Sequence, residues 1–132
     1  MIDSRVPYLA MTAYVRPLRL AALLSALLAL AACDYYADRM SVGHQQFKQG
    51  KYPQAEEAFA EARAAADNGE RLYLSLKALA DVYEAQGDPL TADTLRRRAV
   101  MVMGHCLEDK KNGLRPCPVR EADLHEGTQA GG

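Results

Sequence analysis

Apolar residues recur with the spacing of one helix face in three separate stretches of the chain. In the first stretch they fall at positions i, i+3, i+4, i+7 and i+11, as on one face of a helix with about 3.6 residues per turn. The stretches comprise Ala55, Ala58, Phe59, Ala62 and Ala66; then Leu72, Leu76, Leu79, Ala80 and Tyr83; and finally Ala92, Leu95, Ala99 and Val102. The pattern predicts amphipathic helices that pack their apolar faces together.

Helix-breaking residues separate these stretches. Gly50 precedes Pro53, Gly87 precedes Pro89, and a polar loop ends at Gly69. Proline is tolerated in the first turn of a helix, and glycine just beyond a helix end accepts the left-handed conformation. We therefore expect an all-α fold of four helices at residues 35–49, 53–66, 70–86 and 89–104. The short connections make neighbouring helices antiparallel.

Two segments of the chain resemble each other at a fixed offset of 37 residues. A fixed period of this size in helix-forming sequence indicates a helical repeat. The matching pairs are Gly50 with Gly87, Ala55 with Ala92, and Ala62 with Ala99.

The two segments resemble tetratricopeptide repeats. The residues that carry the resemblance are Gly43, Gly50, Tyr52, Ala55, Phe59 and Ala62 in the first unit, and Leu79, Ala80, Tyr83, Gly87, Ala92 and Ala99 in the second. The resemblance implies two antiparallel helix hairpins over residues 35–104, in which small residues such as Gly43 let helices approach closely. The chain departs from the family pattern at Gln46 and Arg96, and its period exceeds the usual length of about 34 residues. A four-helix bundle with accidental similarity is the alternative.

In this family, the first helix of each repeat lines a concave groove that receives peptides. The resemblance therefore implies a groove that binds a partner protein, lined by Met40, His44, Phe47, Lys77, Asp81 and Glu84. Met40 and Phe47 also belong to an apolar stripe of their helix, so they would be buried if that stripe faces the core.

The N-terminal part of the chain has the pattern of a targeting segment. Residues 20–32 are apolar except for Ser25, and Arg16 and Arg19 precede them. A helix that spans a bilayer needs about 20 apolar residues, whereas this run of 13 fits the hydrophobic region of a secretory signal peptide. An uncleaved anchor or a buried helix is the alternative.

The residues that follow, Leu30-Ala31-Ala32-Cys33, resemble the lipobox of bacterial lipoproteins. The resemblance implies that residues 1–32 are removed as a signal peptide and that Cys33 is acylated. Residues 33–38 then form the lipidated N-terminus and a short linker. The protein would be held in the bacterial envelope facing the periplasm. Asp34 favours the inner membrane, although the outer membrane remains open, as does the choice of start between Met1 and Met11.

Length and charge restrict the classes of function. A chain of 132 residues allows one small domain and excludes a large two-lobed enzyme. The 16 basic and 17 acidic residues give a net charge of −1, so no positive field points to nucleic acid. Without residues 1–32, the chain is slightly more acidic.

Two further cysteines, Cys106 and Cys117, lie 11 residues apart. An even number of cysteines in an oxidising compartment indicates a disulfide. It would close a C-terminal cap segment, residues 105–126, ahead of a disordered tail at residues 127–132. A metal site that includes His105 and His125, or a pair of reactive thiols, is the alternative, although the closely spaced cysteine pairs typical of metal sites are absent.

These features predict a non-catalytic envelope lipoprotein that serves as a scaffold or adaptor for another protein in envelope assembly or secretion. The sequence contains no nucleophile motif, phosphate-binding glycine loop or metal signature, so we expect neither an enzyme nor a cofactor. Two repeats are few, because such units usually need at least three to bury their apolar faces. A self-associating structural lipoprotein and a small thiol or metal-binding protein are the alternative functions.

Overall fold

The computed structural model describes residues 17–28 and 35–125 of the chain. The chain divides into two units, Met1–Asp34 and Tyr35–Gly132. In the first unit, residues 17–28 form a helix. Within the described ranges, no helix is both long enough and apolar enough to cross a bilayer. Cys33, Asp34 and the tail at residues 127–132 lie outside the described residues.

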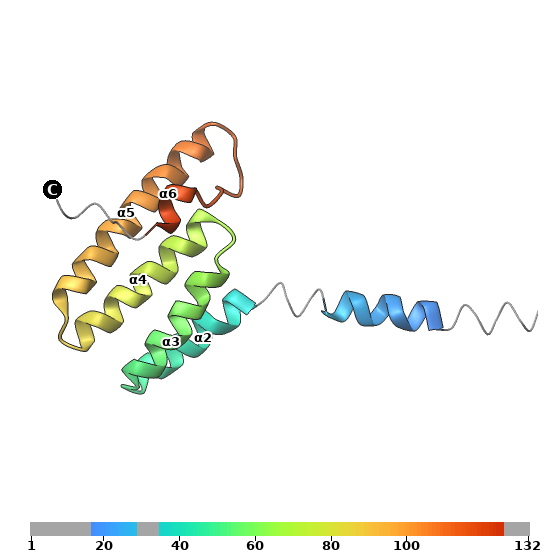
Figure 1. Ribbon diagram of the computed structural model, residues 1–132, viewed down its shortest axis with the longest axis horizontal. Coiled ribbons are helices and arrows are strands. Elements are labelled where there is room, and N and C mark those ends of the chain that lie inside the picture. The colour runs from blue at the N-terminus through green and yellow to red at the C-terminus, as the bar shows by residue number, and fades with distance from the viewer. Residues whose placement is uncertain (1–16, 29–34, 126–132) are drawn as a thin grey trace, which may run out of the picture. The chain divides into compact units, whose positions relative to one another are not determined.

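The second unit is built from two antiparallel helix hairpins (Figure 1). The first hairpin pairs α2 (Tyr35–Lys48) with α3 (Tyr52–Ala65), and the second pairs α4 (Gly69–Ala85) with α5 (Pro89–Lys111). Packing of α3 against α4 joins the hairpins, and a short helix, α6 (Glu121–Leu124), contacts α5. The prediction of an all-α fold, with two hairpins and a disulfide-closed C-terminal segment, is confirmed.

The turns inside the two hairpins are built alike. Gly50 and Gly87, which the repeat pairs at an offset of 37 residues, have φ angles of +72° and +84°. Few residues other than glycine adopt such angles without strain. After each glycine, the next backbone N–H donates to a carbonyl five residues earlier, at 2.9 Å in both turns. This geometry ends α2 and α4 in the same way.

Polar side chains fix the starts of α4 and α5. The Asn68 side chain accepts a hydrogen bond from the N–H of Arg71 at 3.0 Å. The Asp88 carboxylate accepts the N–H of Thr91 at 3.1 Å and its hydroxyl at 2.6 Å. These hydrogen bonds from Thr91 lower the pKa of Asp88 below its usual value. Both helix starts therefore follow from local sequence.

Small residues allow the helices to pack closely. Ala55 and Ala80 are fully buried. A Cβ atom added to Gly43 in α2 would lie only 2.5 to 2.9 Å from three ring carbons of Phe59 in α3. The aromatic ring therefore occupies the space that a side chain at position 43 would need. All the residues of the main core cluster belong to α3, α4 and α5, so the core lies entirely within the second unit.

The predicted end of the fourth helix at residue 104 is wrong, because α5 continues to Lys111. Cys106 and Asp109 are buried, so the last two turns of α5 keep a packed face. Gly113, with a φ angle of +84°, then ends the helix. Residues 105–111 therefore belong to α5 and not to a separate cap segment.

The sequence assigns residues 35–38 both to the predicted linker at residues 33–38 and to the start of the first helix, and the structure places them in the first turn of α2. Tyr36 is buried, and its hydroxyl donates to the carbonyl oxygen of Arg71 at 3.0 Å. This contact with α4 explains why the helix begins directly at Tyr35.

We predict opposite effects of alanine at two glycines. Gly43→Ala lowers the free energy of unfolding by about 1–3 kcal/mol, because its methyl group overlaps the ring of Phe59. Gly104→Ala, measured at concentrations where the chain is monomeric, is the control: its Cβ meets no described atom within 4 Å, so the better helix propensity of alanine raises stability by up to about 1 kcal/mol. Urea unfolding followed by circular dichroism measures both. Equal stabilisation by the two substitutions would contradict the packing described for Gly43.

Candidate interaction surfaces and the C-terminal closure

Three of the six predicted groove residues lie together on the exposed face of α4. Lys77, Asp81 and Glu84 are all exposed and follow one another at helical spacing. Arg96 of α5 contacts both carboxylates, at 3.3 Å from Asp81 and in a closer contact with Glu84. Hydrogen bonds to Glu84 and to Asp81 raise the pKa of Arg96 above its usual value. The Lys77 ammonium lies 5.5 Å from the centre of the Tyr73 ring.

The other three predicted groove residues, on α2, do not form a common surface. Met40 and Phe47 are half-buried and pack against the core, and the Phe47 ring lies 5.5 Å from the ring of Tyr52. His44 is exposed, with its ring edge-on to Phe59 at 5.0 Å between centroids. Of these three residues, His44 alone is therefore fully available at the surface.

A concavity of about 340 Å³ lies where α3, α4, α5 and α6 meet. Its lining combines two guanidinium groups with small apolar side chains and one buried carboxylate. The lining residues are Ala60, Arg63, Ala64, Ala66, Leu72, Arg98, Asp123 and Leu124. None of the six predicted groove residues is among them.

A second, shallower concavity of about 230 Å³ lies between α2 and α3. Arg39 bridges it, with hydrogen bonds to Asp38 at 2.7 Å and to Glu61 at 3.1 Å. The side-chain oxygen of Gln46 is buried there without a hydrogen-bond partner among the described residues. This concavity is polar, and it also lies apart from the six predicted residues.

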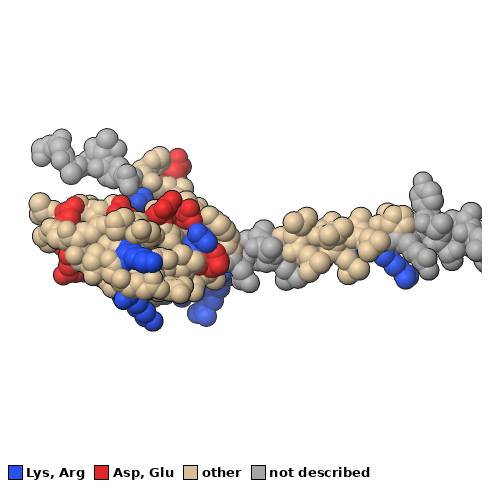
Figure 2. Space-filling model, turned by 90° about the horizontal axis from the view of Figure 1, so that it is seen from below, with Lys and Arg blue, Asp and Glu red and all other residues tan. Residues whose placement is uncertain are grey.

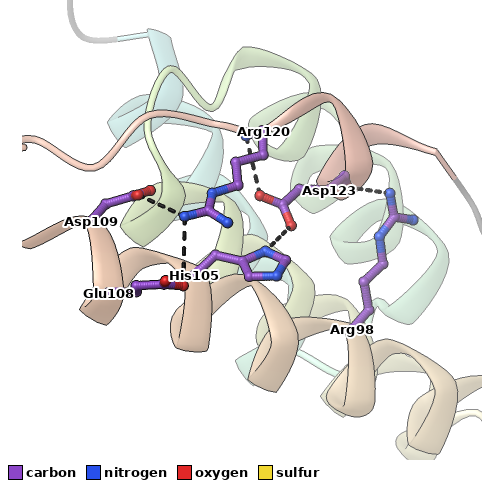
Figure 3. A network of polar contacts seen from close by, with 6 residues as sticks. All are labelled: Arg98, His105, Glu108, Asp109, Arg120 and Asp123. Carbon is purple, nitrogen blue, oxygen red and sulfur yellow. Dashed lines mark hydrogen bonds and ion pairs between the residues drawn. The ribbon is translucent and has the colours of Figure 1, made fainter.

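A network of polar contacts holds α6 against α5 (Figure 3). Asp123 of α6 is buried, and one carboxylate oxygen lies 3.0 Å from Nδ1 of His105 on α5. The other oxygen accepts the backbone N–H of Arg120 at 3.2 Å. Arg98 of α5 donates to the main-chain carbonyl of Asp123. The buried carboxylate thus meets partners from both elements.

A second set of charges holds the segment before α6 against α5. We call the contacts of Arg98, His105 and Asp109 with Arg120 and Asp123, together with the Cys106–Cys117 disulfide, the C-terminal closure. The Arg120 guanidinium donates to the buried carboxylate of Asp109 at 2.7 Å and lies 3.8 Å from Glu108. Its hydrogen bond with Asp109 raises the pKa of Arg120 above its usual value. This ion pair ties the C-terminal segment to the last turns of α5.

The disulfide adds a covalent link to the same closure. Cys106 of α5 and Cys117 of the following loop are bonded, with Cα atoms 5.2 Å apart, and both side chains are buried. The carbonyl oxygen of Cys117 also accepts the N–H of Gly69 at 2.9 Å, at the start of α4. Neither Cys106 nor Cys117 therefore carries a free thiol in this structure. Within the described ranges, no group of three or more histidine, cysteine or acidic side chains is placed to hold a metal ion.

Of the residues that hold α6 and the C-terminal segment against α5, only the cysteines and His105 stand out in the sequence. Arg98, His105 and Asp109 recur at intervals of seven and four residues, which places them along one side of a helix. This spacing indicates a shared helix side only if the helix continues to Lys111, beyond the predicted end at residue 104. Arg120 and Asp123 lie in a stretch with little local pattern, so no sequence signal placed them against α5.

Comparisons with models of protein families, with curated proteins and with solved structures found no match for this chain.

We predict that Asp123→Ala releases α6 from α5. Loss of the buried carboxylate leaves the N–H of Arg120 and the ring of His105 without their partner, which lowers the free energy of unfolding by about 1–3 kcal/mol. Glu121→Ala, in the same short helix, is the matched control because the Glu121 side chain is almost fully exposed. Thermal unfolding of both variants measures the difference. An equal melting temperature for the two would contradict a structural role for Asp123.

Proposed function

We propose that this chain is a bacterial envelope lipoprotein that holds a small helical-repeat scaffold at a membrane and presents it to another envelope protein. The observation that carries this proposal is the boundary between the two units. The packed unit begins at Tyr35, two positions after Cys33, the cysteine of the lipobox-like sequence.

Residues 17–28, the described part of the segment before Cys33, supply no member of the core cluster. The large leucine side chains of residues 17–28 are 60–71% exposed. The core cluster lies entirely in the second unit. A segment that a signal peptidase removes must be dispensable for the mature fold, and the exposure of residues 17–28 supports this for the described part.

The repeated construction of the two hairpins supports a scaffold. Ala55 and Ala92 are both fully buried, and so are Ala62 and, within 1%, Ala99, at the offset of 37 residues that also relates the two turn glycines. Hairpins that repeat in this way stack into extended surfaces, which typically serve for binding other proteins.

The polar groups of the described residues support a binding role more than catalysis. The buried polar side chains are Ser75, Asp109 and Asp123, and each is hydrogen-bonded within the fold. Figure 2 shows acidic and basic side chains interspersed over one face of the second unit, without a field of one sign. Such a surface suits recognition of a protein better than that of a nucleic acid.

We expect Cys33→Ser to release the protein from the membrane. Acyl chains on Cys33 would contribute about 0.8 kcal/mol per buried methylene, and the hydroxyl of serine does not accept them in this pathway. In the unsubstituted protein, mass spectrometry should find an acylated peptide from Cys33 to Arg39 and no peptide from residues 1–32. Ser41→Ala, at an exposed position of α2, is the control. An unmodified Cys33 in a cytoplasmic fraction would overturn the lipoprotein proposal.

The scaffold proposal is tested separately by crosslinking in intact cells. A photoreactive residue in place of Lys77 should capture one envelope protein in reproducible amounts, because Lys77 lies on the exposed face of α4. The same probe at Glu57, exposed on α3, is the control and should not capture that protein. Failure of the Lys77 probe to capture any protein, with the fold and the membrane location intact, would count against the groove but not against lipidation.

A further inference from the structure

The outer face of α5 carries large apolar side chains without a partner among the described elements. Ala92, Leu95, Ala99 and Val102 face α4 and the core. On the opposite side, Leu90 is 81% exposed, Val100 69%, Met101 62% and Leu107 53%. Figure 1 shows α5 at the edge of the second unit, with α4 along one side. We define the outer face of α5 by Leu90, Arg97, Val100, Met101, Gly104, Leu107 and Glu108.

Single exposed leucines are common on protein surfaces, but several large apolar side chains along one helix face indicate an interaction site. Residues 97, 101, 104 and 108 recur at intervals of four, three and four, so they form one continuous stripe. The C-terminal closure covers the side of α5 that carries Arg98, His105 and Asp109. It therefore leaves this stripe open.

Gly104 lies in the middle of the stripe. A glycine inside a helix reduces helix stability relative to alanine. Apart from the backbone of α5 itself, no described atom lies within 4 Å of the position of its missing Cβ, so packing among the described residues gives no reason for a glycine here. Beside a second helix, the same position is a shallow hole in an apolar surface.

The charges of the stripe are arranged for a second copy of the same helix. Consider two copies of α5 that pack antiparallel about a two-fold axis midway between Met101 and Gly104. The Met101 side chain of each copy then lies opposite Gly104 of the other, where the missing side chain leaves room for it. The same centre places Arg97 opposite Glu108, once on each side of the axis. A second copy of α5 therefore satisfies both pairings at once, Met101 with Gly104 and Arg97 with Glu108.

Both charged groups are available for this contact. The Arg97 side chain is 79% exposed and contacts only Asp93, at 2.8 Å, among its described ion pairs. The Glu108 side chain is 67% exposed and lies 3.8 Å from Arg120. We propose that the outer face of α5 is a homodimer interface, in which two antiparallel α5 helices pack around Met101 and Gly104. The proposal does not depend on lipidation or on the groove.

Charge reversal tests both the interface and its register. The folded unit, residues 35–132, contains the whole core and its own disulfide, so it is studied with the disulfide intact by sedimentation equilibrium. The unsubstituted unit should be dimeric. R97E and E108R should each raise the dimer dissociation constant about tenfold or more, because each places like charges together at two symmetric positions. The double variant R97E/E108R should restore most of the lost affinity.

Lys51→Glu, an exposed charge reversal before α3, is the matched control and should leave the dissociation constant unchanged. Circular dichroism of each variant checks that the monomer remains folded. A unit that is monomeric at all concentrations overturns the proposal, even if a different protein binds this face. A double variant that dimerises no better than the single ones overturns the antiparallel register.

Discussion

The fold depends on how α5, the last long helix of the two hairpins, is covered by the residues that follow it. Two helix hairpins bury the inner face of α5 against α4, and within the described residues the only further element packed on α5 is the short helix α6. The C-terminal segment supplies part of that cover through the Cys106–Cys117 disulfide, the Arg120–Asp109 ion pair and the contact between His105 and Asp123. These contacts explain why α5 extends to Lys111 and why its outer stripe stays exposed.

Features that depend on local sequence could be predicted. The turn glycines, the positions of the proline residues and the small buried residues follow from backbone sterics and helical spacing, and the helix ends at Gly50 and Gly87 agree with the structure. The end of α5 could not be predicted, because its last turns are held by residues that are distant in sequence. The groove residues Met40 and Phe47 show the same limit: their spacing fits either a groove or a core, and in the structure both are half-buried against the core cluster.

The two candidate surfaces lie on different helices and have different chemistry. The face of α4 around Lys77, Asp81 and Glu84 is polar, and two of its carboxylates are held by Arg96. The outer face of α5 is mainly apolar and has a glycine at its centre. A scaffold built this way would use one surface to pair with itself and the other to select a partner, so neither role requires a catalytic site.

Amide hydrogen exchange tests the C-terminal closure most directly. The N–H of Gly69 donates to the carbonyl of Cys117, so its exchange rate reports whether the loop is docked on the start of α4. We expect slow exchange at Gly69 and Asp123 in the oxidised protein, in which the loop is docked. After reduction of the disulfide, exchange at both should become fast, while the N–H of Leu72, bonded to Asn68 within α4, stays protected. Fast exchange at Gly69 in the oxidised protein, or no change on reduction, would contradict the docking of the disulfide-closed loop on the start of α4.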